Sequence, residues 1–510
     1  MQPQPAISEN PFAASREKFE ALIVSLNSSP AFAMTHADLE RALWTEGLEI
    51  LRLLFQDHLD LRCLREIAES GILGKDGVLR THRRDSDRQL ETLFGTVTVG
   101  RLEYGARGHT SLHPMDAKLN LPDGLFSHEV SRRVAEAIAQ GPYEAAIESV
   151  DSTSGAHIAR RQAERLVIKA AVDFDAFYAM RAATVPMGSR ESILVITVDG
   201  KGIVMRQEDL RESTRKAAKK ASRKLKHRLT KGEKANRKRM ATVAAVYAIG
   251  RFDRTPQDIM DDLRREKKAE KRPRPHGKRV WASVRKDPEE VIREAFAEAE
   301  CRDRNRKKTW VVLLDGNATQ LEIVQRLAKE TEREVVIVLD FIHAVEYLWG
   351  AAHAFHKAGT PEAEAWVTER MTMLLQGKAN GIARGMRRSA TCLGLDAEKR
   401  EAIDKCAGYL IKYGKFMNYD LYLAAGLPIA SGVIEGACRH LIKDRMDITG
   451  ARWSLEGAEA VLRLRAIRSS GDFEAYWRFH EHQEAKRNHV SLFAVPVMRT
   501  ETGAQMELAS

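Results

Sequence analysis

Three acidic residues from distant parts of the chain stand where their side chains could meet. Asp199 and Asp315 each follow a short, apolar, β-branched run, and each precedes a glycine. Such runs predict buried strands that deliver their last carboxylates to the edge of a sheet. Ser431 is placed to cap a helix, and the hydrophobic spacing after it puts Glu435 in the first helical turn. The three acids could therefore share one site.

A first-turn glutamate also has an ordinary structural explanation. Acidic side chains are common there because they offset the positive end of the helix dipole. This explanation is sufficient for Glu435 taken alone. The two aspartates upstream favour a shared site, and both interpretations stay open at this stage.

The positive charge of the chain is concentrated in two segments. The net charge is +11, yet residues 211–239 alone hold 14 Lys or Arg against two Glu, and residues 264–279 hold nine against two. Solvated charged helices or loops can look the same. Beside a suspected carboxylate site, such segments favour a polyanionic substrate, since neutralised phosphates supply most of the sequence-independent affinity for DNA.

Composition narrows the class of protein. A chain of 510 residues with 44% hydrophobic residues is long enough for about three globular domains. The five cysteines are scattered without a C-x-x-C pair, which argues against a disulfide framework or a structural zinc site. We find no leader and no apolar run near the ~20 residues of a membrane span, so we expect a soluble, intracellular protein.

The N-terminal part is expected to be mainly helical. Two helices joined through a glycine-containing turn around Gly155 match the outline of a helix-turn-helix, whose second helix would lie in the major groove. Ordinary helical cores give the same outline. The expected segments are a disordered tail at 1–13, a helical region at 14–125, and a helical region at 126–185 that could bind DNA. The helical region at 14–125 includes a short β element near 92–104.

From Ser192 the pattern alternates between strands and helices. Pro288 is placed near the start of one helix, and Thr319 and Glu322 predict a capping box for the next. The order βββαβαβ emerges, with basic insertions at 209–239 and 262–279. The first of the five expected strands ends at Asp199. The other four lie at 240–250, 278–284, 309–315 and 334–340. The remaining segments are a core that extends over 190–342, a helical insertion at 343–428, the Glu435 helix and further helices at 429–480, and a loose tail at 481–510.

Together these residues resemble the DDE transposases of bacterial insertion sequences, specifically the ISKra type. The likeness runs from about Leu93 to Trp477 and rests on the combination of motifs rather than on any one of them. The motifs are Thr197-Val-Asp-Gly-Lys-Gly202, Leu313-Leu-Asp-Gly-Asn317, Val338-Leu-Asp-Phe-Ile-His343, Ser431-Gly-Val-Ile-Glu-Gly-Ala-Cys-Arg439 and Arg445 with Gly450-Ala-Arg-Trp453.

The resemblance implies an α/β RNase H-like catalytic domain interrupted by an all-α insertion. It implies that Asp199, Asp315 and Glu435 bind two Mg²⁺ ions, with Mn²⁺ able to substitute and no organic cofactor. Oxygen ligands suit this hard cation, and a pair of such ions can activate the attacking oxygen and stabilise the leaving one at phosphorus. Asp340 is the rival second ligand. His343 is implied as an accessory residue, or else as a helix-start residue that packs near the site.

The implied activity is strand cleavage by water at the element ends, followed by attack of the freed 3′-OH on target DNA. The implied partner is double-stranded DNA, bound by a dimer or larger homo-oligomer in the bacterial cytoplasm, at the nucleoid and without a membrane. The predicted DNA contacts are Arg160, Arg161, Arg165, Lys216, Lys219, Lys220, Arg223, Lys224, Arg439, Arg445, Arg452 and Trp453.

Several alternatives stay open. Trp453 is equally well explained by core packing, and Arg445 by an ion pair with a neighbouring aspartate. A transposon-derived protein that binds DNA without cutting it, and a nuclease that hydrolyses without strand transfer, are rival functions. An RNA-associated basic protein is a weaker one, because it would not need converging carboxylates.

Overall fold

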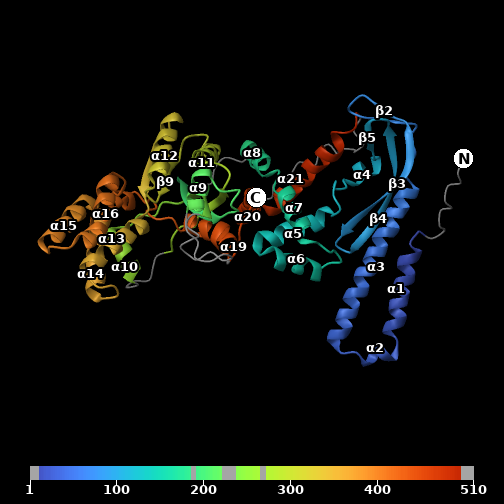
Figure 1. Cartoon of the computed structure of the whole chain (residues 1–510), viewed down its shortest axis with the longest axis horizontal. Helices are drawn as coiled ribbons and strands as arrows, with labels where there is room; N and C mark the ends of the chain where they lie inside the picture. Colours follow the sequence, from blue (N-terminus) through green and yellow to red (C-terminus); the bar gives the residue numbers. More distant parts are fainter. Residues whose placement is uncertain (1–10, 185–190, 221–236, 265–270, 449, 495–510) are drawn as a thin grey trace. The chain divides into compact units, whose positions relative to one another are not determined.

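The structure is a computed structural model that describes residues 11–184, 191–220, 237–264, 271–448 and 450–494. The chain divides into two compact units (Figure 1). The first combines Met1–Phe177 with Phe473–Ser510, and the second is Tyr178–Asp472. Among the described residues, no helix combines the length and apolarity that crossing a bilayer requires. The expected disordered tail at 1–13 falls largely outside the described residues, and helix α1 begins at Ala13.

The first unit contains a long helical hairpin and a three-stranded antiparallel sheet (Figure 1). The β element is larger than the sequence predicted, because the strand β3 begins with charged residues that hide the alternating pattern. Leu59 of α3 packs with Leu90, Val97 and Val99 of the sheet. The elements are α1 (Ala13–Leu26), α2 (Ser29–Ala33), α3 (His36–Leu64), β1 (Ile72–Leu73), β2 (Leu79–Arg80), β3 (His82–Thr92), β4 (Gly95–Ala106) and β5 (His109–Leu112).

The predicted helices of residues 126–185 are present. However, the connection between the two helices assigned to the helix-turn-helix, residues 153–159, is longer than the three- or four-residue turn of that motif. The helices are α4 (Pro114–Leu119), α5 (His128–Gln140), α6 (Tyr143–Ser152), α7 (Arg160–Ala170) and α8 (Phe174–Thr184), the last of which continues into the second unit.

The prediction of a loose tail from residue 481 is wrong for its first part. Helix α21 (Phe473–Ala485) continues into a π-helical turn, η4 (Lys486–Val490). Buried Asp173 fixes this segment, because it accepts hydrogen bonds from both Nη atoms of Arg487, at 2.7 and 2.8 Å, and pairs with His480 Nδ1 at 2.7 Å. These partners are some 300 residues apart in the sequence, so no local pattern reveals them.

The second unit is built on a mixed five-stranded sheet in the order β10-β9-β6-β7-β8. β6 (Ile193–Val204), β9 (Thr309–Leu314) and β10 (Val335–Leu339) are parallel, whereas β7 (Lys238–Ile249) is antiparallel to β6 and to β8 (His276–Ser283). The first strand does not stop at Asp199 as predicted. It continues to Val204, because β7 pairs with it along its whole length, from Ile249 to Lys238.

Helices α9 (Glu212–Lys220), α10 (Pro256–Arg264), α11 (Pro288–Arg302) and α12 (Ala318–Glu330) connect these strands. α11 begins at Pro288 as predicted. The capping box predicted from Thr319 is wrong, because the side chain of Asn317 caps α12 by accepting from the backbone amides of Thr319 and Gln320. Thr319 therefore lies inside the first turn.

After the sheet the chain is helical, as predicted. Figure 1 shows helices α13 to α16 grouped on the side of the sheet where β9 lies. The helices are α13 (Phe341–Phe355), α14 (Pro361–Leu375), α15 (Ala379–Cys392), α16 (Ala397–Tyr413), η2 (Gly414–Phe416) and α17 (Tyr419–Ala424). α18 (Gly432–Ala437) then leads through a π-helical turn, η3 (Cys438–Lys443), and α19 (Asp444–Met446) to α20 (Leu455–Ser469). Buried Glu459 ties α20 to the sheet by accepting from Ser283 Oγ at 2.9 Å.

Candidate functional site

Asp199 and Asp315 lie beside each other on neighbouring parallel strands. β6 pairs with β9 in a register that sets Thr197 opposite Leu313, and each aspartate stands two residues further along its chain. Both are half-buried. One oxygen of Asp199 accepts from the Gly200 amide at 2.6 Å. The register thus brings two of the three predicted acids together.

The charge of Asp199 acts on Asp315. Burial has the largest effect on the pKa of Asp315 and raises it; a hydrogen bond from the Asn317 amide opposes this, and the charge of Asp199 raises it further. A half-buried pair of like charges is relieved by a proton on one of them or by a cation between them.

An aromatic cluster from the helical region fixes the loop after Asp315. Gly316 has φ +96°, and a Cβ there would lie 2.8 Å from the ring of Tyr409. The Tyr409 hydroxyl donates to the carbonyl oxygen of Asp315 at 3.0 Å, and its ring stacks on Tyr347 at 4.1 Å. The glycine of this Asp-Gly pair is therefore required by backbone conformation and by close approach. Neither tyrosine was predicted as part of the site, and no motif marks them.

Asp340, the rival ligand, has a structural role in this geometry. One of its oxygens caps α13 by accepting from the amides of Ile342 (2.9 Å) and His343 (3.3 Å). The other accepts from the amide of Ser431 at 3.0 Å. Asp340 thereby joins the starts of α13 and α18. His343 pairs with Glu346 at 3.3 Å and lies edge-on to Tyr347, as the helix-start alternative expected.

The helix that carries Glu435 is held against Asp199 by a cysteine. Ser431 caps α18 as predicted, accepting from the Ile434 amide at 3.3 Å. The thiol of Cys438 donates to Asp199 Oδ2 at 3.0 Å. Glu435 lies one turn before Cys438 and on the same face of the helix, with an exposed side chain. The i, i+3 spacing of the two residues was a signal that the sequence analysis missed.

The three acids do not form a complete ligand set in this structure. Within the described ranges, no group of three or more His, Cys, Asp or Glu side chains is arranged to hold a metal ion. Asp199 and Asp315 are adjacent, and among the described residues the link from Glu435 to them runs through its helix, by way of Cys438.

The π-helical turn η3 after Cys438 is held by a buried arginine. Arg465 of α20 donates Nε to the carbonyl of Leu441 at 3.1 Å and Nη2 to that of His440. Burial, with the neighbouring Arg445, lowers the pKa of Arg465 to about 10. Single π-helical turns often occur at functional sites.

Two of the predicted DNA contacts are buried in this structure. Arg445 is 3% exposed and Trp453 is 6% exposed. The guanidinium of Arg445 lies 4.8 Å from the centre of the Trp453 ring, and the indole Nε1 donates to the carbonyl of Met446 at 3.2 Å. Trp453 also pairs with Met205 at the end of β6. Both side chains pack in the core, in the way that the structural alternative for Trp453 expected.

The other predicted contacts differ in their surroundings. Arg160 pairs with Glu144, Lys216 with Glu212 at 2.8 Å, and Arg439 with Asp444 at 3.5 Å. The exposed ones without an ion pair among the described residues are Arg161, Arg165, Lys219, Lys220 and Arg452; Arg165 also lines a cavity of about 260 Å³. Arg223 and Lys224 lie outside the described residues.

Comparisons with known proteins give only distant likeness, among solved structures. No family model and no curated protein matches the chain. Among solved structures, the Drosophila P element transposase strand transfer complex is similar at 10% identity and a TM-score of 0.25, over 72% of this chain and 82% of that one. A TM-score this low does not establish a shared fold, and the function proposed below rests on the chain's own geometry.

Proposed function

We propose that the protein is a DNA transposase that cleaves DNA strands and joins them to target DNA at a carboxylate site on an RNase H-like domain. The observation that carries the proposal is the register of β6 and β9, which sets Asp199 and Asp315 two residues beyond the paired Thr197 and Leu313, where the charge of Asp199 acts on Asp315. Two half-buried carboxylates that lie near each other can bind a divalent cation, because the cation offsets the repulsion between their charges.

The sheet supports the RNase H-like part of the proposal. The first strand of the unit, β6, lies at the centre, the next two strands follow it antiparallel on one side, and the last two lie parallel on the other. This arrangement supports the βββαβαβ order that the alternating pattern predicts, with Asp199 on the central strand.

The donor set fits Mg²⁺. Carboxylate oxygens are the ligands that this ion prefers, and the raised pKa of Asp315 indicates a place where added positive charge is favourable. Asp199 and Asp315 would hold the metal, with Glu435 as the third acid. Bound there, the metal would activate the attacking oxygen and stabilise the leaving oxygen at the phosphorus atom.

The chain's own residues prepare this site. Cys438 orients Asp199 through its thiol hydrogen bond and keeps the Glu435 helix against β6. Tyr409 holds the backbone of Asp315. The exposed lysines of α9, Lys216, Lys219 and Lys220, would neutralise phosphates of double-stranded DNA. Two DNA ends must be brought together before transfer, so a homo-oligomer is part of the proposal.

A cleavage and joining assay tests the proposal. Labelled duplexes that carry the ends of the DNA element encoding the protein are incubated with purified protein in Mg²⁺, Mn²⁺ or EDTA. We expect metal-dependent nicking and joined products, both lost in Asp199→Asn, Asp315→Asn and Glu435→Gln. Glu322→Gln is the matched control, because Glu322 is exposed on α12 and forms no ion pair within the described residues.

The rival functions give different results in the same assay. Tight binding of the duplex without cleavage in any divalent metal would favour a DNA-binding protein whose acids are structural. Cleavage without joined products would favour a nuclease. Full activity of a purified Asp199→Asn or Asp315→Asn variant would overturn the assignment of that residue.

A further inference from the structure

A second polar site lies at the opposite end of the central strand β6. A cavity of about 550 Å³ opens beside the first residues of β6, where Leu194 lines it. Leu194 is five residues before Asp199 on one strand, so the cavity is about 17 Å from the carboxylate pair. It is therefore distinct from the candidate active site.

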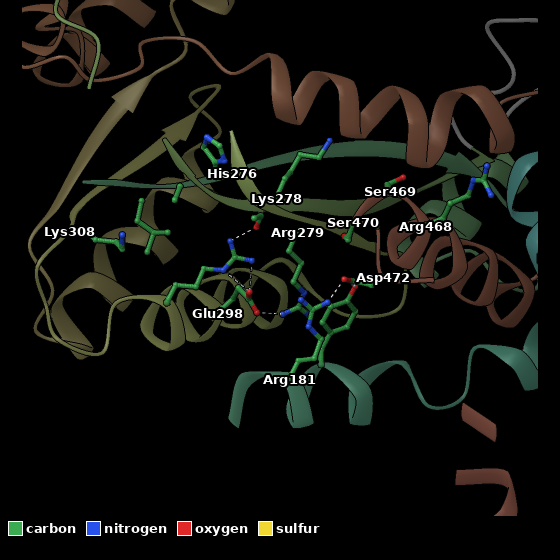
Figure 2. A pocket seen from close by; sticks show the side chains of 16 residues that line it. Arg181, His276, Lys278, Arg279, Glu298, Lys308, Arg468, Ser469, Ser470 and Asp472 are labelled. Carbon is green, nitrogen blue, oxygen red and sulfur yellow. Dashed lines mark hydrogen bonds and ion pairs between the residues drawn. The ribbon is translucent and has the colours of Figure 1, made fainter. Parts of the chain in front are cut away.

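Basic side chains dominate the wall of this cavity. Figure 2 shows the labelled ones on α8, on β8, just before β9 and at the end of α20, with Lys278 and Arg279 on opposite sides of β8. Six Lys or Arg line it against two acids, a local balance of +4 with histidine neutral. The basic residues are Arg181, Lys278, Arg279, Arg302, Lys308 and Arg468, with His276, and the acids are Glu298 and Asp472.

Both acids are already engaged by residues of the wall. Glu298 accepts from Arg302 Nε at 2.8 Å and pairs with Arg279. Asp472 accepts from the Tyr178 hydroxyl at 2.9 Å and pairs with Arg181, and Figure 2 shows these pairs side by side. Neither carboxylate is placed to neutralise a further cation.

One donor of the wall has capacity for a ligand. The Lys278 side chain is exposed and forms no ion pair within the described residues. The Nε of Arg279 is buried without a hydrogen-bond partner there, although its guanidinium lies 3.7 Å from the centre of the Tyr178 ring. The stacked ring and Glu298 fix this guanidinium in place, so it adds fixed positive charge to the wall, while Lys278 projects from the other face of β8.

The helix end at the cavity does not oppose an anion strongly. The last carbonyls of α20 are occupied by backbone amides: Ser470 donates to Ala466, Gly471 to Arg468 and Asp472 to Ile467. These hydrogen bonds partly offset the negative partial charge at the C-terminal end of α20.

We propose that this cavity is a phosphate-binding site. Cationic lysine and arginine donors in a concave wall recognise an oxyanion and exclude a cation or an apolar ligand. The choice of phosphate among oxyanions rests on the proposed function, since a DNA substrate would present phosphodiesters to this edge of the unit. The same wall can bind free phosphate, and the two sources are separable by experiment.

The test is equilibrium binding in EDTA, where cleavage is absent, with inorganic phosphate by calorimetry and with a duplex of arbitrary sequence by anisotropy. Lys278→Glu is compared with Lys329→Glu, a charge reversal on α12 where Lys329 is exposed and lacks an ion pair among the described residues. We expect Lys278→Glu to weaken binding about tenfold, the value of one charge-assisted hydrogen bond, and Lys329→Glu to leave it unchanged.

The pattern of losses identifies the source. Weaker binding of inorganic phosphate assigns the site to a free phosphate, whereas weaker binding of the duplex alone, with a salt slope reduced by about one, assigns it to the DNA backbone. Equal binding by the two variants in both arms overturns the proposal. Because Asp199→Asn leaves this cavity intact, its binding in the same assay separates the failure of the phosphate site from the failure of the catalytic proposal.

Discussion

Cys438 donates its thiol hydrogen to Asp199 at 3.0 Å, across 239 residues of sequence. This contact joins the helix of Glu435 to the central strand of the sheet. It makes Cys438 a positioning residue for the proposed reaction, acting through Asp199 and not on the DNA.

The contact can be tested by a pair of substitutions. Cys438→Ala removes the donor and should lower the rate of Mg²⁺-dependent cleavage about tenfold, the effect of losing one hydrogen bond to a charged group. Cys438→Ser keeps a donor and should retain most of the rate. The measurement is single-turnover cleavage, with circular dichroism to verify folding. Equal rates for the two variants would show that the thiol does not position Asp199.

Gly316→Ala should destabilise the protein by about 1–3 kcal/mol, because an alanine there combines a left-handed backbone with a close contact. Its φ is +96° and the new Cβ would lie 2.8 Å from the Tyr409 ring. Gly359→Ala is the matched control, with φ +77° and no atom within 4 Å. Urea unfolding measures the stability of both variants. An equal loss of stability in the two would mean that the Tyr409 ring moves aside for the new Cβ without a free-energy cost.

Stability without metal should depend on Asp315 and pH. Since the folded-state pKa of this carboxyl is raised, the folded protein binds the proton more tightly than the unfolded chain does, and stability falls as pH rises through that interval. In EDTA, Asp315→Asn should therefore have a higher Tm than the wild type at pH 7, and the difference should vanish below the ordinary pKa of an aspartate. A lower Tm for the variant at pH 7 would contradict the raised pKa.

Removal of metal should affect the same two proteins differently. Mg²⁺ at about ten times its Kd stabilises a folded protein by about 1.4 kcal/mol when it binds the folded state alone. We expect addition of Mg²⁺ to raise the Tm of the wild type, and EDTA to reverse the rise. Asp315→Asn should show little change. A similar rise in both proteins would place the bound ion elsewhere.

Asp340→Asn separates the structural role of Asp340 from a ligand role. Asparagine is as good an N-cap as aspartate, so the start of α13 should be kept, while the bond to Ser431 is weakened. We expect partial retention of cleavage and a loss of stability of about 1 kcal/mol. A loss of cleavage as complete as in Asp315→Asn would restore Asp340 as a metal ligand.

Much of the second unit was predictable because its signals are local. Buried strands read as β-branched runs, Pro288 marks the start of α11, and Ser431 caps the helix of Glu435. These features depend on neighbours within a few residues, so the amino-acid sequence by itself determined the order of elements and the acids that follow them.

Tertiary structure decided which of these residues meet. Asp315 lies beside Asp199 because β9 pairs with β6 in one register, while Asp340 is taken up by backbone amides at two helix starts. Arg445 and Trp453 are of residue types that often contact DNA, yet both are buried and pack against each other. Register, burial and the choice among distant partners are set by the free energy of the whole core, which no short stretch of sequence contains.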